Sequence, residues 1–474
     1  MKIPLSLAIS ISAICFLSAC GGGSGNSGGG GGTGGATHFA VTAPGAAAAG
    51  TPFTIAVVAL NSSNRTVTGY SGTVHFTSSD AQAVLPPDST LANGMENISV
   101  TLQSPGSSTI VATDIAMPTI TGTSTAIQVA MNPNLHGFQA TGAMGGERAS
   151  HTATLLPNGK VLVAGGTDSL GNDLATAELF DPTTGTFTAT GSMISSRISF
   201  TATLLAHGPA ATNGKVLMVG GTADNTAELF DPSTGTFAAT GTPVGTRFEG
   251  TATLLVSGKV LLAGGHASTA ELFDPATGTF TATGPMKSAR DECTATLLND
   301  GTVLITGGES NLASFNTAEL FDPTTGTFTA TGSMTEARAG QSATLLNNGK
   351  VLVTGGINSN DDVSTTAELF DPASGTFSTV SPMTSGHAFH TATLLDDGTV
   401  LVAGGFPLPN SSGNGSVIAE LFDPATHLFA RTGSLGTGRF FHTATKLNNG
   451  EVLITGGEFK NTPVMILKSA ELYK

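Results

Sequence analysis

The pattern of apolar and polar positions repeats seven times between residue 150 and the end of the chain. One unit holds a Thr-Ala-Thr-Leu-Leu run, a two-residue turn, a continuous apolar run such as 161–164, an Ala-Glu-Leu-Phe run and a Thr-Gly-Thr-Phe run. Periods of about 20 to 50 residues indicate stacked supersecondary units. A double glycine ends each apolar run, and its first members are Gly165, Gly220, Gly264, Gly307, Gly355, Gly404 and Gly456.

Each unit predicts four short antiparallel strands. The turn Asn158-Gly159 and its equivalents suit type I′ hairpins, because both central residues need positive φ. The second strand, such as 161–164, is continuously apolar rather than alternating, which is typical of a strand covered on both faces. Pro182 and Gly185 mark a second turn, before the strand that carries Phe187. Two-residue turns and the lack of a 3.6-residue period exclude a helical solenoid, so the units are predicted to be β-propeller blades.

The repeat array begins and ends at different points of the repeat unit. Residues 138–144 match the fourth-strand segment 187–193, whereas residues 470–474 match a third strand. We therefore expect the early segment to supply the missing strand of the last blade, which would remove open sheet edges. The predicted fold is an all-β, seven-bladed propeller over residues 135–474.

The double glycines, the Ala-Glu-Leu-Phe-Asp-Pro-x-Thr-Gly-Thr-Phe stretch and the period resemble the kelch repeat, in a form closest to galactose oxidase-like propellers. Enzymes of that family use a copper–radical centre built from Tyr, Cys and His. The chain has two Tyr, of which Tyr70 precedes the propeller and Tyr473 falls on the last third strand, so neither is expected at the channel mouth. The chain also has no Trp, which sialidase-type repeats require. The resemblance thus implies the fold without the catalytic centre.

The N-terminus carries a targeting segment over residues 1–20. Lys2 precedes an apolar stretch, and Leu17-Ser18-Ala19-Cys20 resembles a bacterial lipobox, in which Cys20 becomes the lipidated residue. An ordinary secretory signal with a chance Cys is the alternative. Residues 21–36 are almost entirely Gly and Ser, as in a flexible tether. The expected location is the bacterial envelope, and Gly21 after the Cys favours the outer membrane or cell surface.

Residues 37–131 predict a separate antiparallel β-sandwich. Apolar runs at 54–60, 72–77, 98–102, 109–112 and 126–129 are separated by Gly, Pro, Asn and Ser. The stretch 69–80 resembles bacterial Ig-like modules of surface proteins. Such modules usually act as spacers.

Charge and cysteine content narrow the classes of function. The chain has 18 Lys and Arg against 33 Asp and Glu, a net charge of −15, without a basic cluster. Nucleic acid and anionic membrane surfaces are therefore poor partners. With Cys15 removed and Cys20 lipidated, Cys293 remains alone, so no intrachain disulfide is expected.

A basic residue stands four positions before each first strand, and every third strand carries a Glu. We expect these to form structural pairs that hold the blades together; a ring of Arg that binds carboxylates or sugar hydroxyls is the alternative. The basic residues are Arg148, Arg197, Arg247, Arg290, Arg338, His387 and Arg439. The glutamates are Glu178, Glu228, Glu271, Glu319, Glu368, Glu420 and Glu471.

The residue directly before each first strand is expected to line the channel entrance. His151, His390 and His442 fall on neighbouring blades of a closed ring and are weak candidates for a zinc or copper site, with packing as the other explanation. Asp291 and Glu292 are expected to raise the pKa of the Cys293 thiol, which disfavours a nucleophile. The whole set, which we call the slot residues, is His151, Phe200, Gly250, Cys293, Gln341, His390 and His442.

The connections between blades and those between second and third strands vary in length and lie together on one side of the ring, where binding groups are normally carried. We expect a lipid-anchored surface protein whose propeller face, with His151, Phe200, Gln341, His390 and His442, binds a protein or glycan without catalysis and without a cofactor. The alternative is a carbohydrate-active or metal-dependent oxidoreductase on the same scaffold.

Overall fold

The structure is a computed structural model that describes residues 35–80, 83–102, 106–130, 137–206, 212–221, 225–406, 415–459 and 464–474. The targeting segment, Cys20 and nearly all of the tether lie outside these residues. Strands and turns account for all regular structure in the described ranges, so the all-β prediction is confirmed. No helix in these ranges is long and apolar enough to cross a membrane.

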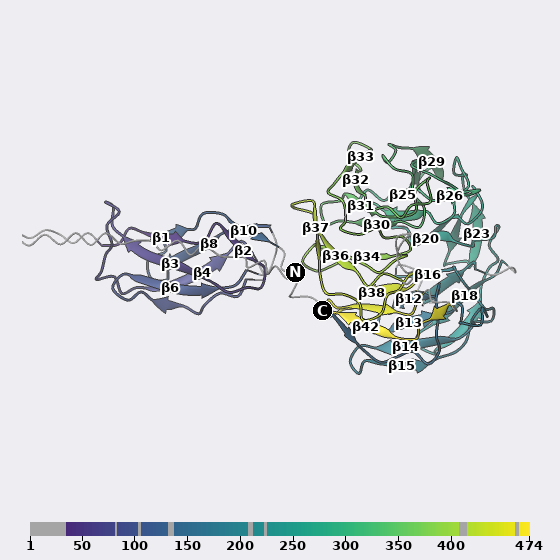
Figure 1. The fold of residues 1–474 in the computed structure, drawn as a ribbon, viewed down its shortest axis with the longest axis horizontal. Coiled ribbons are helices and arrows are strands. Elements are labelled where there is room, and N and C mark those ends of the chain that lie inside the picture. The colour runs from purple at the N-terminus through teal and green to yellow at the C-terminus, as the bar shows by residue number, and fades with distance from the viewer. Residues whose placement is uncertain are drawn as a thin grey trace, which may run out of the picture.

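The N-terminal part packs three small sheets around one core that contains Ile55, Val74, Ile110 and Ile127, all fully buried (Figure 1). The five predicted strands are present, with ends shifted by one to three residues. In contrast to the fully antiparallel sandwich expected, β10 runs parallel to β2. The strands are β1 (His38–Thr42), β2 (Ala46–Ala48), β3 (Phe53–Leu60), β4 (Thr73–Ser78), β5 (Ser89–Thr90), β6 (Met95–Val100), β7 (Gly106–Ser108), β8 (Ile110–Asp114), β9 (Thr121–Thr123) and β10 (Ile127–Ala130).

The repeats fold into seven four-stranded sheets, which we number as blades 1 to 7. In blade 1, β12 (Thr152–Leu155), β13 (Val161–Ala164), β14 (Ala177–Asp181) and β15 (Thr186–Ala189) pair antiparallel in chain order. Blade 2 contains β16 (Thr201–Leu204), β17 (Val216–Val219), β18 (Ala227–Asp231) and β19 (Thr236–Ala239), and blade 3 contains β20 (Gly250–Leu254), β21 (Val260–Gly264), β22 (Ala270–Asp274) and β23 (Thr279–Ala282). Blade 4 contains β24 (Thr294–Leu297), β25 (Val303–Thr306), β28 (Ala318–Asp322) and β29 (Thr327–Ala330), and blade 5 contains β30 (Ser342–Leu345), β31 (Val351–Thr354), β32 (Ala367–Asp371) and β33 (Thr376–Thr379). Blade 6 contains β34 (Thr391–Leu394), β35 (Val400–Ala403), β36 (Ala419–Asp423) and β37 (Leu428–Arg431).

Blade 7 is assembled from both ends of the array, as the out-of-phase repeats predict. It contains β38 (Thr443–Lys446), β39 (Val452–Thr455) and β42 (Ala470–Tyr473), and its outer strand is β11 (Phe138–Ala140). Phe138 lies opposite Tyr473 in this pairing. Two small hairpins decorate the loops of blades 4 and 7: β26 (Glu309–Ser310) with β27 (Ala313–Ser314), and β40 (Glu458–Phe459) with β41 (Met465–Ile466).

The first strands of the blades surround a common centre. Each contacts the first strand of the next blade, and β12 also contacts β38, which closes the circle. Figure 1 shows these strands nearest the centre and the fourth strands, such as β15, β23 and β37, at the periphery.

The core lies between the blades. Every residue of the seven second strands is buried, because a neighbouring blade covers each face. Leu304 of blade 4, for example, packs in one cluster with Val351, Val353 and Phe370 of blade 5. Burial of such side chains contributes about 1.5–3 kcal/mol each. The sheets therefore hold each other in place without a disulfide.

Candidate functional site

The double glycines fit a close approach between blades. Gly165 and Gly166 both have positive φ, 65° and 92°, where a side chain would be strained. A Cβ at Gly165 would lie 2.6 Å from the ring of Phe200, and one at Gly166 would lie 2.4 Å from the carbonyl oxygen of Ala149. The end of each second strand is thus a bare backbone surface against which the next blade packs.

The basic residues before the first strands lie against this surface, fully enclosed. Their exposed fractions are 0–2 %, and each donates to the carbonyl oxygen of the first glycine in its own blade at 2.5–3.0 Å. Each also lies 2.6–3.3 Å from the third-strand Glu of that blade. The backbone N–H of the residue three positions before the basic residue donates to the same Glu in all seven blades. The structure therefore brings together all seven pairs.

These basic residues, which we call the lock residues, connect neighbouring blades. The side chain of Arg197 is bound within blade 2, but its backbone N donates to Leu174 O at 3.1 Å and its O accepts from Gly166 N at 2.8 Å, both in blade 1. Because the guanidinium groups are buried and paired, they do not face the channel. The alternative of an open Arg ring that binds carboxylates or sugar hydroxyls does not agree with this geometry.

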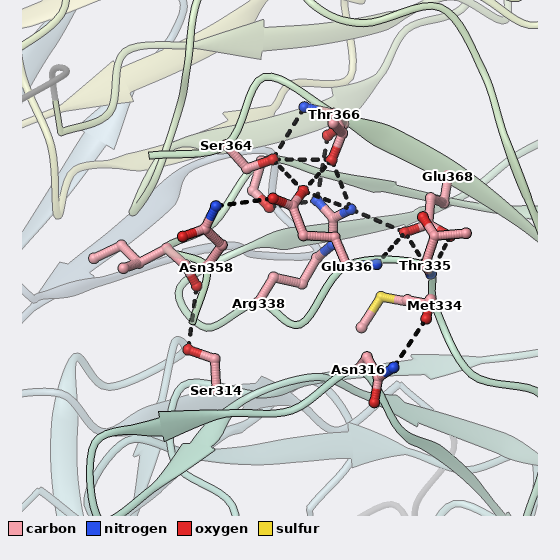
Figure 2. Close-up of polar contacts among 12 residues, drawn as sticks. Ser314, Asn316, Met334, Thr335, Glu336, Arg338, Asn358, Ser364, Thr366 and Glu368 are labelled. Carbon is pink, nitrogen blue, oxygen red and sulfur yellow. Dashed lines mark hydrogen bonds and ion pairs between the residues drawn. The ribbon is translucent and has the colours of Figure 1, made fainter. Parts of the chain in front are cut away.

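Blade 5 adds a second carboxylate to the pair (Figure 2). Glu336 lies 3.5 Å from Arg338 and accepts hydrogen bonds from Ser364, Thr366 and Asn358. These donors lower the pKa of Glu336 against the opposing effect of burial, which is the largest influence on it. Glu336 thereby fixes the loop between β31 and β32.

Blade 6 carries His387 in place of Arg. Its Nδ1 lies 2.5 Å from Gly404 O and its Nε2 lies 3.3 Å from Glu420 Oε1, with both side chains fully buried. A carbonyl and a carboxylate are acceptors, so this geometry suits an imidazole that carries a proton on both nitrogens.

The slot residues lie at the mouth of the central channel, and the six that have side chains pack toward the preceding blade. His151, His390 and His442 place Nε2 within 2.9–3.1 Å of hydroxyl groups on Thr455, Thr354 and Thr391. Burial, and then neighbouring positive charge, hold the pKa of His151 well below its usual range and lower that of His442 to about 3. Burial likewise holds the pKa of His390 well below its usual range. The three imidazoles are therefore neutral at pH 7.

The metal site that the sequence left open at these histidines is not formed. Across the described residues, no three His, Cys, Asp or Glu side chains are placed to hold one metal ion. The imidazoles instead cover the first glycines of the preceding blades: His442 lies against Gly404 and His151 against Gly456. Packing on a bare backbone accounts for His at this position.

Cys293 is buried, and the pKa of its thiol is raised to about 12. Burial is the largest cause, and Asp291 makes only a small contribution. The pKa of the thiol is thus raised, as the sequence predicts, but burial rather than the neighbouring acidic residues is the main cause.

A second ring at the mouth was missed by sequence reasoning. It consists of the residues one position before the slot residues, and we call these the rim residues. The backbone N of each donates to the carbonyl oxygen of the preceding one at 2.8–3.3 Å, and Ser150 N donates to Phe441 O, so the hydrogen bonds close a circle. All seven have φ between 49° and 62°. The rim residues are Ser150, Ser199, Glu249, Glu292, Gly340, Phe389 and Phe441.

The slot and rim residues together line a cavity of about 310 Å³. Its wall is chemically divided: Glu249 and Glu292 stand on blades 3 and 4, whereas Phe389 and Phe441 stand on blades 6 and 7 with ring centroids 4.5 Å apart. Burial raises the pKa of Glu292 to about 8, with further increases from Glu249, Glu309 and Asp291. The pKa of Glu249 is also raised, chiefly by burial.

The two tyrosines lie elsewhere. The Tyr70 hydroxyl donates to Asp114 in the N-terminal part, and Tyr473 on β42 has its hydroxyl 2.9 Å from that of Thr432. Burial raises the pKa of both phenols. With both tyrosines away from the mouth and Cys293 enclosed, the residues present do not fit a copper centre built from Tyr, Cys and His.

Comparisons with known proteins agree with this architecture. The kelch motif model matches residues 148–194 and 338–384, which contain blades 1 and 5. A fungal alcohol oxidase of the AA5 family, solved in complex with copper, is similar in structure at a TM-score of 0.59 and 17% sequence identity, over 72% of this chain and 76% of that one. No curated protein matches the sequence. The chain therefore carries kelch motifs and has the propeller fold seen in the AA5 oxidase.

Proposed function

We propose that this protein is a lipid-anchored binding protein of the bacterial envelope whose propeller holds a protein or glycan ligand at the channel mouth. The supporting observation is the rim. Its backbone is the same in all seven blades, yet its side chains are acidic on one side and aromatic on the other. A rigid ring that presents a varied set of side chains is suited to recognition, since binding groups are usually held by a fixed scaffold.

We infer the lipid anchor from the lipobox around Cys20, and the surface location from that motif together with the tether of residues 21–36. In this proposal the N-terminal sandwich acts as an Ig-like spacer between membrane and propeller. The ligand then meets the face that carries the variable loops.

The test compares two faces of the same ring. The purified protein is applied to a glycan array and to immobilised envelope proteins, and each ligand found is tested again with Phe389→Ala/Phe441→Ala. The matched control is Val256→Ala, an apolar residue that is 75 % exposed in the turn between β20 and β21 on the opposite face. We expect binding to fall with the double variant and to persist in the control. Binding that survives the mouth variant but is lost in the control would contradict the proposal.

The second candidate function is a metal-dependent oxidoreductase, which the likeness to the copper-containing oxidase favours at the level of fold. Its test is metal analysis of purified protein grown with copper, together with a peroxide assay on primary alcohols and sugars. One equivalent of bound copper with peroxide release would favour this function over binding alone.

A further inference from the structure

The ionisable side chains that line the channel mouth carry either negative charge or none, and Glu292, whose pKa is about 8, becomes fully charged only above that pH. Glu249 and Glu292 are the cavity's only acidic side chains, and the three histidines beside them are neutral because burial lowers their pKa values. The six lock arginines are enclosed within the blades. Within the described ranges, neither Glu249 nor Glu292 has an ion pair or a side-chain hydrogen bond. Carboxylates that are partly removed from water without a partner are costly, so a positively charged group at the mouth would offset this cost.

The aromatic part of the rim lies close to these carboxylates. Gly340 separates Glu292 from Phe389 along the ring, with Gly340 N donating to Glu292 O and Phe389 N donating to Gly340 O. A Cβ at Gly340 would lie 2.6 Å from the Phe389 ring, so this ring extends over blade 5 toward blade 4. An aromatic face beside a carboxylate pair suits a cation attached to an apolar stem.

A buried acceptor in the same wall has no partner. Gln341 is 6 % exposed, lines the cavity on blade 5, and donates from Nε2 to Thr306 O at 2.9 Å. Its Oε1 has no hydrogen bond within the described part of the chain. Buried side-chain oxygens are normally satisfied, so an orphaned acceptor in the wall of the cavity that Glu249 and Glu292 also line indicates that a hydrogen-bond donor belongs there.

Resting on the proposed binding function, we propose that the mouth accepts a basic side chain, Arg or Lys, that a partner protein inserts between the Glu249–Glu292 pair and the Phe389–Phe441 pair. A protein partner is favoured over a free amine because two apolar side chains are exposed on the loops between second and third strands, which lie on the same side of the ring as the mouth. Leu170 and Leu312, in the loops of blades 1 and 4, are 86 % and 89 % exposed. Their exposure provides a contact surface beyond the cavity itself.

The first test uses N-acetyl-arginine amide and its uncharged isostere N-acetyl-citrulline amide, titrated into the full chain by calorimetry and ligand-observed NMR. We expect the arginine compound to bind about tenfold or more tightly, since hydrogen bonds to charged groups are the stronger class. Glu249→Gln/Glu292→Gln should abolish the difference. Asp362→Asn, which removes an exposed charge from the loop of blade 5, should preserve it.

Equal affinity for the two compounds, no binding of either, or an undiminished preference in the double Gln variant would overturn the proposal. The preference should also grow as pH rises from 7 to 9, because the pKa of Glu292 is about 8 while the guanidinium remains charged. Glu292 is faced by Glu249, Asp291 and Glu309, and His266 lies beside Asp291. Because His266→Gln leaves the cavity wall unchanged, the pH effect should persist in that variant.

A second arm separates a protein side chain from a free amine. The peptide acetyl-Leu-Arg-Leu-amide should bind more tightly than N-acetyl-arginine amide, and Leu170→Asn/Leu312→Asn should weaken only the peptide. Identical affinities of the two compounds would overturn the assignment to a partner protein. If neither basic compound binds while a glycan still depends on Phe389 and Phe441, this inference fails and the proposed binding function stands.

Discussion

Removal of one lock residue should destabilise the ring by more than any surface substitution. Arg338 is fully buried and donates to Gly355 O at 2.7 Å, to Thr366 Oγ1 at 2.9 Å and to Glu368 at 3.0 Å. In Arg338→Ala, Glu368 would keep only the backbone N–H groups of Thr335 and Glu336 as donors. Breaking a buried pair by removing one partner costs about 3–5 kcal/mol.

The size of the ring sets the expected thermal shift. With an unfolding entropy of about 2.1 cal/mol/K per residue and a ring of about 340 residues, this loss lowers Tm by about 4–7 °C. Calorimetric melts of Arg338→Ala and Glu368→Ala measure it. The matched control is Lys350→Ala, which removes a half-exposed pair with Asp371 at 3.0 Å and should cost at most about 1 kcal/mol.

Two results would refute this reasoning. One is a melt of Arg338→Ala within about 1 °C of wild type, which would mean that the pair adds nothing net. The other is an equal fall in Tm for Lys350→Ala, which would show that the buried pair contributes no more to stability than the half-exposed pair does. A further check is His387→Arg, which places in blade 6 the residue found in the other six blades and should keep or raise Tm.

Two further predictions rest on the structure and one on the sequence. Deleting residues 137–144 removes β11 and exposes β42, so the melt should show early unfolding or aggregation, and an unchanged curve would argue against closure by this strand. Glu292 binds its proton more strongly in the folded protein, so the free energy of unfolding should decline as pH rises from about 4.5 to about 8. Urea titrations of Glu292→Gln should lack this decline, and the same pH dependence in variant and wild type would contradict the raised pKa of Glu292. Cys20→Ala should move the protein from the membrane to the soluble fraction, and retention in the membrane would rule out anchoring through this residue.

The repeats made the propeller predictable because local signals agree with each other. Asn158-Gly159 gives the turn, the apolar run at 161–164 gives a strand buried on both faces, and the displaced segment at 138–144 gives the closing strand. The pairs between lock residues and third-strand glutamates could also be predicted from the sequence, since one basic residue and one Glu per repeat must be satisfied somewhere in a folded ring. The exact strand ends and the parallel pairing of β2 with β10 could not be predicted, because they depend on packing in the N-terminal core.

The functional end of the ring was harder to predict, since repeat patterns emphasise what is constant. The slot was found because it directly precedes a constant strand, and three of its seven members are His. The rim was missed because its residue types differ widely, from Ser150 to Glu249 to Phe389. A sequence signal did exist: one position varies in type while the spacing around it stays fixed.

The rim also shows how a repeated scaffold becomes specific. All seven rim residues are held in the left-handed region by the closed circle of hydrogen bonds, and the six that are not glycine each carry a conformational cost of order 1–3 kcal/mol there. Because the backbone is set by the ring, a change of side chain at one rim position alters the mouth without altering the fold. The division into an acidic and an aromatic side is therefore a property of the rim sequence alone, and substitutions at Glu249, Glu292, Phe389 or Phe441 should change ligand preference independently of the stability set by the lock residues.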